Sequence, residues 1–240
     1  MKIFVVNPNS TASMTETIRL SAVRAAAPGT QIMVATVAGA PASIEGYADE
    51  ARAIPGTLDA IRQAETQGAQ ATVIACFDDP GLGAAREVAS GPVIGICQAG
   101  IQVAITIAAR FSIVTTLPRS VPIIEDLVDV YGAARQCRRV RSVNLPVLAL
   151  EEDPETAFAR LRTEIRRAIN EDGAEAVLLG CAGMAEMCRA LQQETGVPVI
   201  DGVSAAVKLA EAMVGGGFAT AKTGSFAFPR DKSLMIATRP

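Results

Sequence analysis

The sequence predicts an α/β fold of two similar lobes, each a parallel, Rossmann-like sheet covered by helices. A pseudo-twofold axis would relate the lobes, with the active site in the cleft between them. Short aliphatic runs alternate with alanine-rich amphipathic segments, which is typical of βαβ units. A segment of the first half recurs in the second half. The 240 residues are 50% hydrophobic, which is enough to fill a sizeable core.

The expected strands are short runs of β-branched and aliphatic residues, and the first begins almost at the N-terminus with Lys2-Ile3-Phe4-Val5-Val6. Such continuous apolar runs are typical of parallel strands that are buried on both faces. The sequence places strands at 2–6, 31–36, 71–75, 93–96, 111–115, 139–144, 176–179, 197–200 and 218–220.

The expected helices are the amphipathic segments between these runs, and glycines such as Gly68, Gly132, Gly173 and Gly196 mark where several of them end. The sequence places helices at 11–26, 47–67, 81–89, 98–108, 121–131, 154–171, 185–194 and 204–215.

An internal repeat supports the division into lobes. Residues 68–76 read GAQATVIAC and residues 173–181 read GAEAVLLGC, and the PVIG of 92–95 matches the PVID of 198–201. We therefore expect a first lobe of about residues 1–113 and a second of about 114–215. The tail, 216–240, would return to the first lobe.

Composition excludes several classes of protein. The net charge is only −3 and tryptophan is absent, so neither a basic surface nor a set of stacking aromatics is available for nucleic acid. Histidine is absent as well. That excludes serine–histidine and cysteine–histidine nucleophiles and histidine-based zinc sites.

The sequence also predicts a cytoplasmic protein. Its start lacks the pattern of a signal peptide, and an odd number of cysteines, five, suits reduced thiols better than a disulfide framework. The uncharged stretch 89–109 is interrupted by Pro92, Gly95 and Gly100, so we interpret it as a buried strand and helix and expect no membrane span.

Two cysteines occupy matching places in the repeat. Cys76 and Cys181 each end a predicted buried strand, just before a turn that leads into a helix. In open α/β sheets this edge binds ligands, and nearby helix N-termini lower the pKa of a thiol toward neutrality. If the lobes face each other, both thiols meet in one cleft.

This arrangement suits racemisation at a carbon next to a carbonyl. One thiolate would remove the proton from one face, and the opposite thiol would return a proton to the other. Backbone N–H groups that follow Cys76 and Cys181 would stabilise the enolate oxygen.

Other candidate groups have simpler explanations. Cys97, Cys137 and Cys188 are expected to be inert, and the sequence has no Cys-x-x-Cys motif for a metal. We interpret Asp78-Asp79 as a turn and helix cap rather than a catalytic carboxylate pair. The basic cluster Arg135, Arg138, Arg139 and Arg141 is expected on a solvated face or at a subunit contact.

The motifs ACFDDPGL at 75–82, LGCAGM at 179–184 and NPNS at 7–10 resemble those of the hydantoin racemases, in the Asp/Glu racemase superfamily. The resemblance runs over nearly the whole chain. It implies a 5-monosubstituted hydantoin as the small-molecule substrate, catalysis by Cys76 and Cys181, and a homo-oligomer without metal or organic cofactor.

The flat ring of such a substrate calls for neutral hydrogen-bonding partners, which the strand ends supply. A local role is an alternative for several of these residues: Asn9 could cap the following helix, Thr115 and Thr116 could end a strand, and Phe77 could belong to the core. The expected substrate-binding residues are Asn9, Ser43, Phe77, Thr115, Thr116, Ala182 and Gly183.

Alternative functions stay open at this point. Racemisation of allantoin, which shares the ring, or another cysteine-dependent isomerisation of the same superfamily would use the same thiols. From a different class, the chain could be a two-lobed small-molecule binding module whose thiols are structural.

Overall fold

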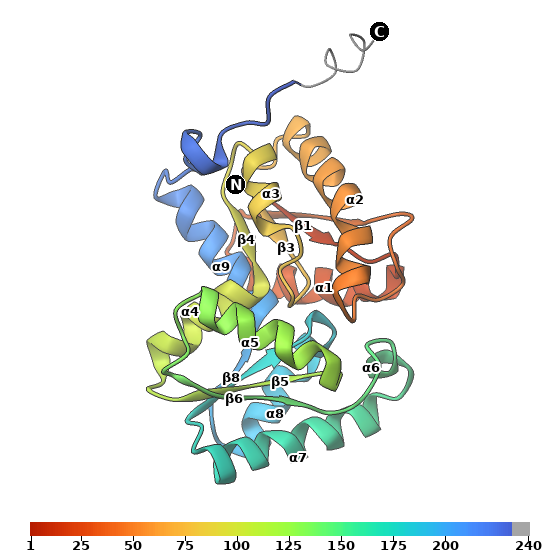
Figure 1. The fold of residues 1–240 in the computed structure, drawn as a ribbon, viewed down its shortest axis with the longest axis vertical. Helices are drawn as coiled ribbons and strands as arrows, with labels where there is room; N and C mark the ends of the chain where they lie inside the picture. The colour runs from red at the N-terminus through yellow and green to blue at the C-terminus, as the bar shows by residue number, and fades with distance from the viewer. Residues whose placement is uncertain (232–240) are drawn as a thin grey trace, which may run out of the picture.

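Two four-stranded parallel sheets form the centres of two lobes, one above the other in Figure 1. The computed structural model describes residues 1–231. The predicted α/β fold of two similar lobes is confirmed, because both sheets have the same strand order relative to the sequence. The orders are β2-β1-β3-β4 and β6-β5-β7-β8.

In the first sheet the central residues of β1, β3 and β4 are buried, as the apolar runs predict, whereas those of the edge strand β2 are partly exposed. The members of this sheet are β1 (Lys2–Asn7), β2 (Gln31–Thr36), β3 (Ala71–Ile74) and β4 (Val93–Gly95). The second sheet contains β5 (Phe111–Thr115), β6 (Cys137–Ser142), β7 (Ala176–Gly180) and β8 (Val199–Asp201). The carboxyl ends of β3 and β7 hold equivalent positions, since each strand is the third in its own sheet order.

Helices lie between the strands along the chain, as the amphipathic segments predict. The α-helices are α1 (Ala12–Ala25), α2 (Tyr47–Thr66), α3 (Leu82–Val88), α4 (Ile96–Ile107), α5 (Val121–Val130), α6 (Ala149–Glu152), α7 (Pro154–Asp172), α8 (Cys188–Thr195) and α9 (Gly202–Gly215). The short 3₁₀ helices are η1 (Pro118–Ser120), η2 (Ala182–Met187) and η3 (Gly224–Phe226).

Two helices are exchanged between the lobes. Helix α4 follows the first sheet but packs on β7 and β8, whereas α9 follows the second sheet but packs on α1, β1, β3 and β4. The two helices also pack against each other. At their crossing a Cβ on Gly202 would lie 2.6 Å from the carbonyl oxygen of Ile96, so only glycine permits this close approach. The exchange joins the two lobes through one continuous core.

The tail returns to the first lobe as far as it is described. Thr220 Oγ1 donates to the carbonyl of Gly91, and the ammonium of Lys222 donates to the carbonyls of Arg86 and Glu87. The expected boundary at 113/114 falls inside β5, all of which pairs in the second sheet. The division at that residue therefore stays a proposal, and residues 232–240 lie outside the described part of the tail.

Most predicted elements are confirmed, with a few differences at their ends. Residues 218–220 form no strand, so that prediction is wrong. The sixth strand begins at Cys137 rather than 139, and α4 begins at Ile96, directly after β4. The short helix α6 was not predicted. Within residues 1–231, no helix combines the length and apolarity needed to cross a bilayer.

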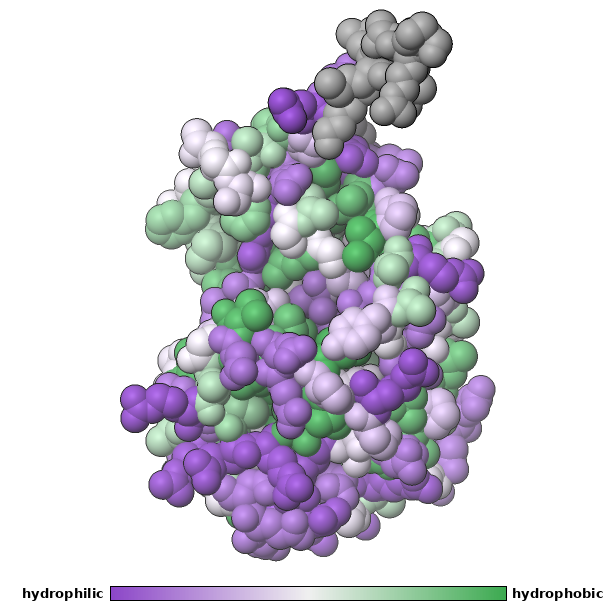
Figure 2. Space-filling view, in the orientation of Figure 1, coloured by the Kyte–Doolittle hydropathy of each residue, from purple (hydrophilic) through white to green (hydrophobic). Residues whose placement is uncertain are grey.

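The basic cluster is only partly on the surface. Arg141 is 5% exposed, and its guanidinium bonds to Asp172 at 2.6 Å and Glu171 at 2.8 Å, so the expectation of a solvated arginine is wrong there. These acids lie at the end of α7. Figure 2 shows hydrophilic side chains gathered over the lower end of the molecule, where Figure 1 places α7.

Candidate active site

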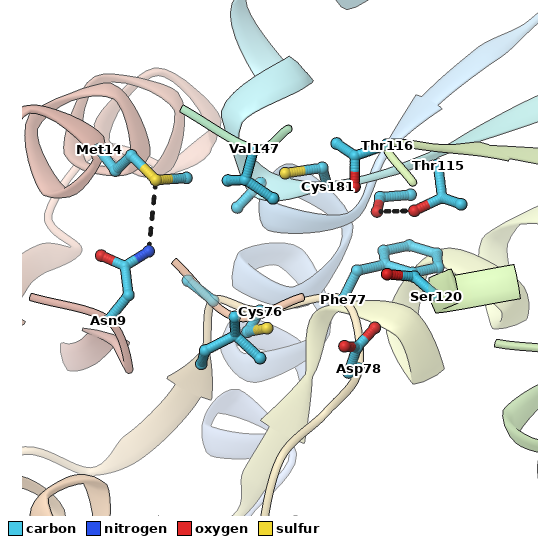
Figure 3. Close-up of a pocket in the computed structure, with 14 residues that line it drawn as sticks. Asn9, Met14, Cys76, Phe77, Asp78, Thr115, Thr116, Ser120, Val147 and Cys181 are labelled. Atoms are coloured by element: carbon cyan, nitrogen blue, oxygen red, sulfur yellow. Dashed lines mark hydrogen bonds between the residues drawn. The ribbon is translucent and has the colours of Figure 1, made fainter. Parts of the chain in front are cut away.

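The thiols of Cys76 and Cys181 line one cavity between the lobes. Cys76 lies just beyond β3 and Cys181 directly follows β7, so the matching strand ends bring them together as the repeat predicts. Both side chains are partly exposed to the cavity rather than sealed in the core. Figure 3 shows their sulfur atoms on opposite sides of the space that they share.

Both halves of the sequence contribute equally to the cavity wall, which bounds about 400 Å³ of empty space including its open mouth. The lining residues are Asn9, Met14, Ile44, Ala75, Cys76, Phe77, Asp78, Thr115, Thr116, Ser120, Val147, Gly180, Cys181 and Ala182. A wall with few polar groups among apolar ones suits a small uncharged ligand.

The Asp78 carboxyl group and the Thr116 and Ser120 hydroxyls lie at one end of the cavity, beside Phe77, and we call this the polar end (Figure 3). Met14 and Val147 lie at the other end, which we call the apolar end, together with Asn9, whose amide is already bonded to Met14. Among the described residues, the hydroxyls of Thr116 and Ser120 have no hydrogen-bond partner although both residues are buried. Buried hydroxyls without protein partners are free to bind a ligand.

Two predicted binding residues also have structural roles. Thr115 Oγ1 donates to the carbonyl of Gly180 at 2.9 Å. Asn9 Oδ1 accepts from the backbone N–H of Thr11 at 2.9 Å, and its Nδ2 donates to the sulfur of Met14 at 3.3 Å. Asn9 therefore shapes the turn before α1 while it also lines the cavity.

The local environment raises the pKa of both thiols, contrary to the lowering expected from helix ends. For Cys76 the main cause is burial, and the negative charge of Asp78 adds to it. Burial likewise raises the pKa of Cys181 to about 12. Opposing this, the backbone N–H groups of Asp78 and Gly183 hydrogen-bond to the sulfurs of Cys76 and Cys181 respectively.

The neighbouring acids Asp78 and Asp79 differ sharply. Both oxygens of Asp79 accept backbone N–H groups at the start of α4, from Cys97 at 3.0 Å and Gln98 at 2.9 Å, and Tyr131 Oη also donates to Asp79 at 2.8 Å. Asp79 therefore caps α4 rather than the helix that follows it in sequence. Asp78 instead faces the cavity, so the turn-and-cap interpretation applies to only one of the pair.

Loops from the two lobes meet over the cavity. Glu45 Oε1 accepts the backbone N–H of Val147 at 2.9 Å, and Glu151 accepts the hydroxyl of Ser13 at 2.6 Å. Ile44 and Val147, which belong to these loops, form part of the wall. These contacts tie the two lobes together beside the cavity.

The structure brings most of the predicted site residues together. Asn9, Phe77, Thr115, Thr116 and Ala182 line the cavity beside the two cysteines. Ser43 and Gly183 are not in the wall. Ile44 takes the place expected for Ser43, and Gly183 contacts the Cys181 sulfur through its N–H instead.

Several residues of the cavity wall could not be predicted from the sequence. Met14, Ile44 and Val147 are apolar residues on α1 and on the covering loops, and nothing in their local pattern separates them from core residues. Ser120 could have been predicted, because it lies in the same segment after a predicted strand as Thr115 and Thr116. No group of three or more Cys, Asp or Glu side chains among the described residues is arranged to hold a metal ion.

Comparisons with known proteins identify the family of the chain. Residues 3–210 match the model of the family described as Asp/Glu/Hydantoin racemase. The chain is 62% identical to a hydantoin racemase of Rhizobium meliloti over 97% of both chains, and 49% identical to one of Pseudomonas sp. (strain NS671) over 99% of this chain and 95% of that one. A solved allantoin racemase from Klebsiella pneumoniae is 49% identical, with a TM-score of 0.95 over 97% of this chain and 95% of that chain.

Proposed function

The chain belongs to the Asp/Glu/hydantoin racemase family, and we propose that it racemises 5-monosubstituted hydantoins by proton transfer between Cys76, Cys181 and C5 of the ring. The observation that carries the proposal is the pair of thiols on opposite sides of one cavity (Figure 3). The binding-module alternative is not favoured, because the curated relatives are named as racemases.

The chemistry needs a base on one face of C5 and an acid on the other. A thiolate takes the C5 proton, the electron pair moves into the adjacent carbonyl as an enolate, and the opposite thiol donates its proton to the other face. The thiol and thiolate have then exchanged roles, so the reverse direction uses the same residues. Burial raises the pKa of each thiol, which also makes its thiolate a stronger base toward a C–H bond.

The cavity suits a neutral ring with an apolar substituent. We place the ring at the polar end, where Thr116 and Ser120 offer free hydroxyls, and the 5-substituent at the apolar end beside Met14 and Val147. The backbone N–H groups near the two thiols are the candidate donors to the enolate oxygen. None of these steps calls for a metal or an organic cofactor.

Two further parts of the proposal concern the protein's context. We expect a homo-oligomer, which is supported by exposed aliphatic side chains such as Leu20, Val23 and Ile107. We also expect a cytoplasmic location, which is supported by five free cysteines, since reducing compartments preserve thiols.

Loss of optical rotation tests the proposed function. The wild-type protein should racemise enantiopure L-5-benzylhydantoin, and Cys76→Ser and Cys181→Ser should each lower the rate by about 10²–10⁴-fold, the range for loss of a general acid or base. Cys137→Ser, on β6 and outside the cavity wall, is the matched control. Unchanged rotation with the wild type, or full activity in either active-site variant, would contradict the proposal.

Allantoin racemisation is the second candidate, and the 49% identity to the Klebsiella pneumoniae enzyme favours it specifically. Allantoin carries a polar ureido group on C5, which would have to lie beside Met14 and Val147 at the apolar end. The ratio of kcat/KM on allantoin to that on benzylhydantoin separates the candidates.

A further inference from the structure

Asp78 is a buried acid that the proposed proton transfer does not use. It is 8% exposed and lines the cavity, yet its carboxyl group has no hydrogen-bond partner among the described residues. Its neighbour Asp79, by contrast, is engaged by Cys97, Gln98 and Tyr131. A buried carboxyl with free oxygens next to a ligand cavity is poised to bind the ligand.

The surroundings of Asp78 favour its neutral form. Burial raises its pKa to about 7, and the charges of Glu50 and Asp79 act in the same direction. Glu50 itself has one buried oxygen without a partner, and burial raises its pKa as well. No lysine or arginine lines the described cavity wall to pull Asp78 toward ionisation.

A neutral carboxyl group carries a hydroxyl donor and a carbonyl acceptor side by side. The complementary partner is an amide edge, in which an N–H lies beside a C=O. A hydantoin ring has such an edge at N3–H and the C4 carbonyl, and this carbonyl adjoins C5 and receives the negative charge when C5 loses its proton. Donation by the Asp78 hydroxyl to this oxygen would therefore strengthen as the enolate forms.

The geometry points to Asp78 as the residue that recognises the N3–H and C4 carbonyl edge of the ring. This inference rests on the proposed function and adds the basis on which the site selects a ring with an unsubstituted amide edge.

Methylation of the substrate nitrogen tests the contact without altering the protein. The kcat/KM of the wild type should be about tenfold or more lower on N3-methyl-5-benzylhydantoin than on 5-benzylhydantoin. The reason is that the methylated substrate no longer has the N3–H that donates to the Asp78 carboxyl group. Equal turnover of the two substrates would overturn the inference. Failure to racemise 5-benzylhydantoin at all would instead overturn the proposed function itself.

Variants at the same position complete the test. Asp78→Leu should lose about 30-fold in kcat/KM on 5-benzylhydantoin and show no further loss on the N3-methyl compound, because the contact is already gone. Asp78→Asn, whose amide keeps a donor and an acceptor, should restore most of the activity. Wild-type kcat/KM in Asp78→Leu would overturn the inference. Asp59→Asn, an exposed acid on α2, controls for the change of charge.

Discussion

Thr115 and Thr116 are neighbours in sequence whose hydroxyl groups have different partners. Thr115 Oγ1 bonds to the carbonyl of Gly180 across the β5–β7 strand ends, whereas the hydroxyl of Thr116 is free at the cavity. The contacts of each threonine thus decide whether it stabilises the fold or is available to bind the substrate. From the sequence alone, both Thr115 and Thr116 are predicted to bind the substrate.

Valine substitutions, which keep the side-chain shape, should separate these roles. Thr115→Val should lower the free energy of unfolding by about 1–3 kcal/mol, because the buried Gly180 carbonyl loses its side-chain donor. Thr116→Val should leave the free energy of unfolding nearly unchanged and lower kcat/KM by about tenfold. Urea unfolding and racemisation kinetics on both variants check this, and a destabilised Thr116→Val would contradict the assignment.

The two cysteines in the cavity could be predicted from the sequence, but the direction in which their pKa values shift could not. Their matching positions in the repeat identify Cys76 and Cys181. The raised pKa comes from burial and from acids whose proximity only the fold creates, such as Glu45 and Glu151 around Cys181. Asp78 lies two residues after Cys76 in the motif, but its sequence context predicts a turn rather than a place in the cavity wall.

The raised thiol pKa values predict a particular pH dependence of alkylation. An acid whose pKa lies above the working pH gains about tenfold in its ionised fraction per pH unit. The rate at which iodoacetamide alkylates Cys76 and Cys181 in the ligand-free protein should therefore keep rising from about pH 7 to 9. Site-resolved mass spectrometry measures this rate for each thiol. A plateau below about pH 8 for both thiols would contradict the raised values, and a small free thiol serves as the reference.

At the scale of elements, we expect the segments that join the lobes beside the cavity to control access to the thiols. The carboxylate of Glu45 holds the Val147 backbone N–H at 2.9 Å, which joins the loop after β2 to the loop after β6. The other contact, from Glu151 to Ser13, joins α6 to α1. These two contacts tie together segments that carry Ile44 and Val147 in the cavity wall.

Glu45→Ala should open this cover. Loss of a hydrogen bond to a charged group should raise the equilibrium constant for loop opening by about tenfold. Iodoacetamide should therefore alkylate both thiols about tenfold faster at a fixed pH. Glu45→Gln keeps the acceptor while it removes the charge that acts on Cys181, and it should remain close to the wild type. Glu152→Ala, on the same helix as Glu151 but exposed, is the control. Equal rates in all variants would show that these loops do not limit access.

Local pattern predicted where elements lie more reliably than where they end. The strands at 31–36 and 111–115 match β2 and β5 because aliphatic runs and glycine or proline boundaries agree there. The residues at 218–220 have the same aliphatic and β-branched character but no neighbouring strand to pair with. Helix α4 begins at Ile96, earlier than predicted, because Asp79 supplies its cap from a distant loop. Gly95 leaves room for that carboxylate.

At the scale of the whole molecule, the exchange of α4 and α9 makes the lobes mutually dependent. Each sheet is covered in part by a helix from the other half of the sequence. The repeat revealed two similar lobes, but it could not reveal this exchange, because equivalent helices have equivalent sequences whichever sheet they cover.

The exchange predicts one cooperative unfolding transition rather than two. Differential scanning calorimetry should give a single peak whose calorimetric and van't Hoff enthalpies agree, because exposure of either sheet removes the helix that covers the other. A single transition is also expected by circular dichroism at two wavelengths. Two resolved transitions would contradict the interdependence of the lobes.

The central claim is that two thiols act on opposite faces of one carbon, and hydrogen exchange at C5 tests it most directly. During early turnover of L-5-benzylhydantoin in D₂O, with an enzyme-free sample as the control, the D-product should carry deuterium at C5 while the remaining L-substrate keeps its proton. That result follows because one thiol removes the substrate proton and the other, already exchanged with solvent, delivers deuterium. A D-product that retains the original proton would mean that a single base moves it from face to face, and would contradict the account.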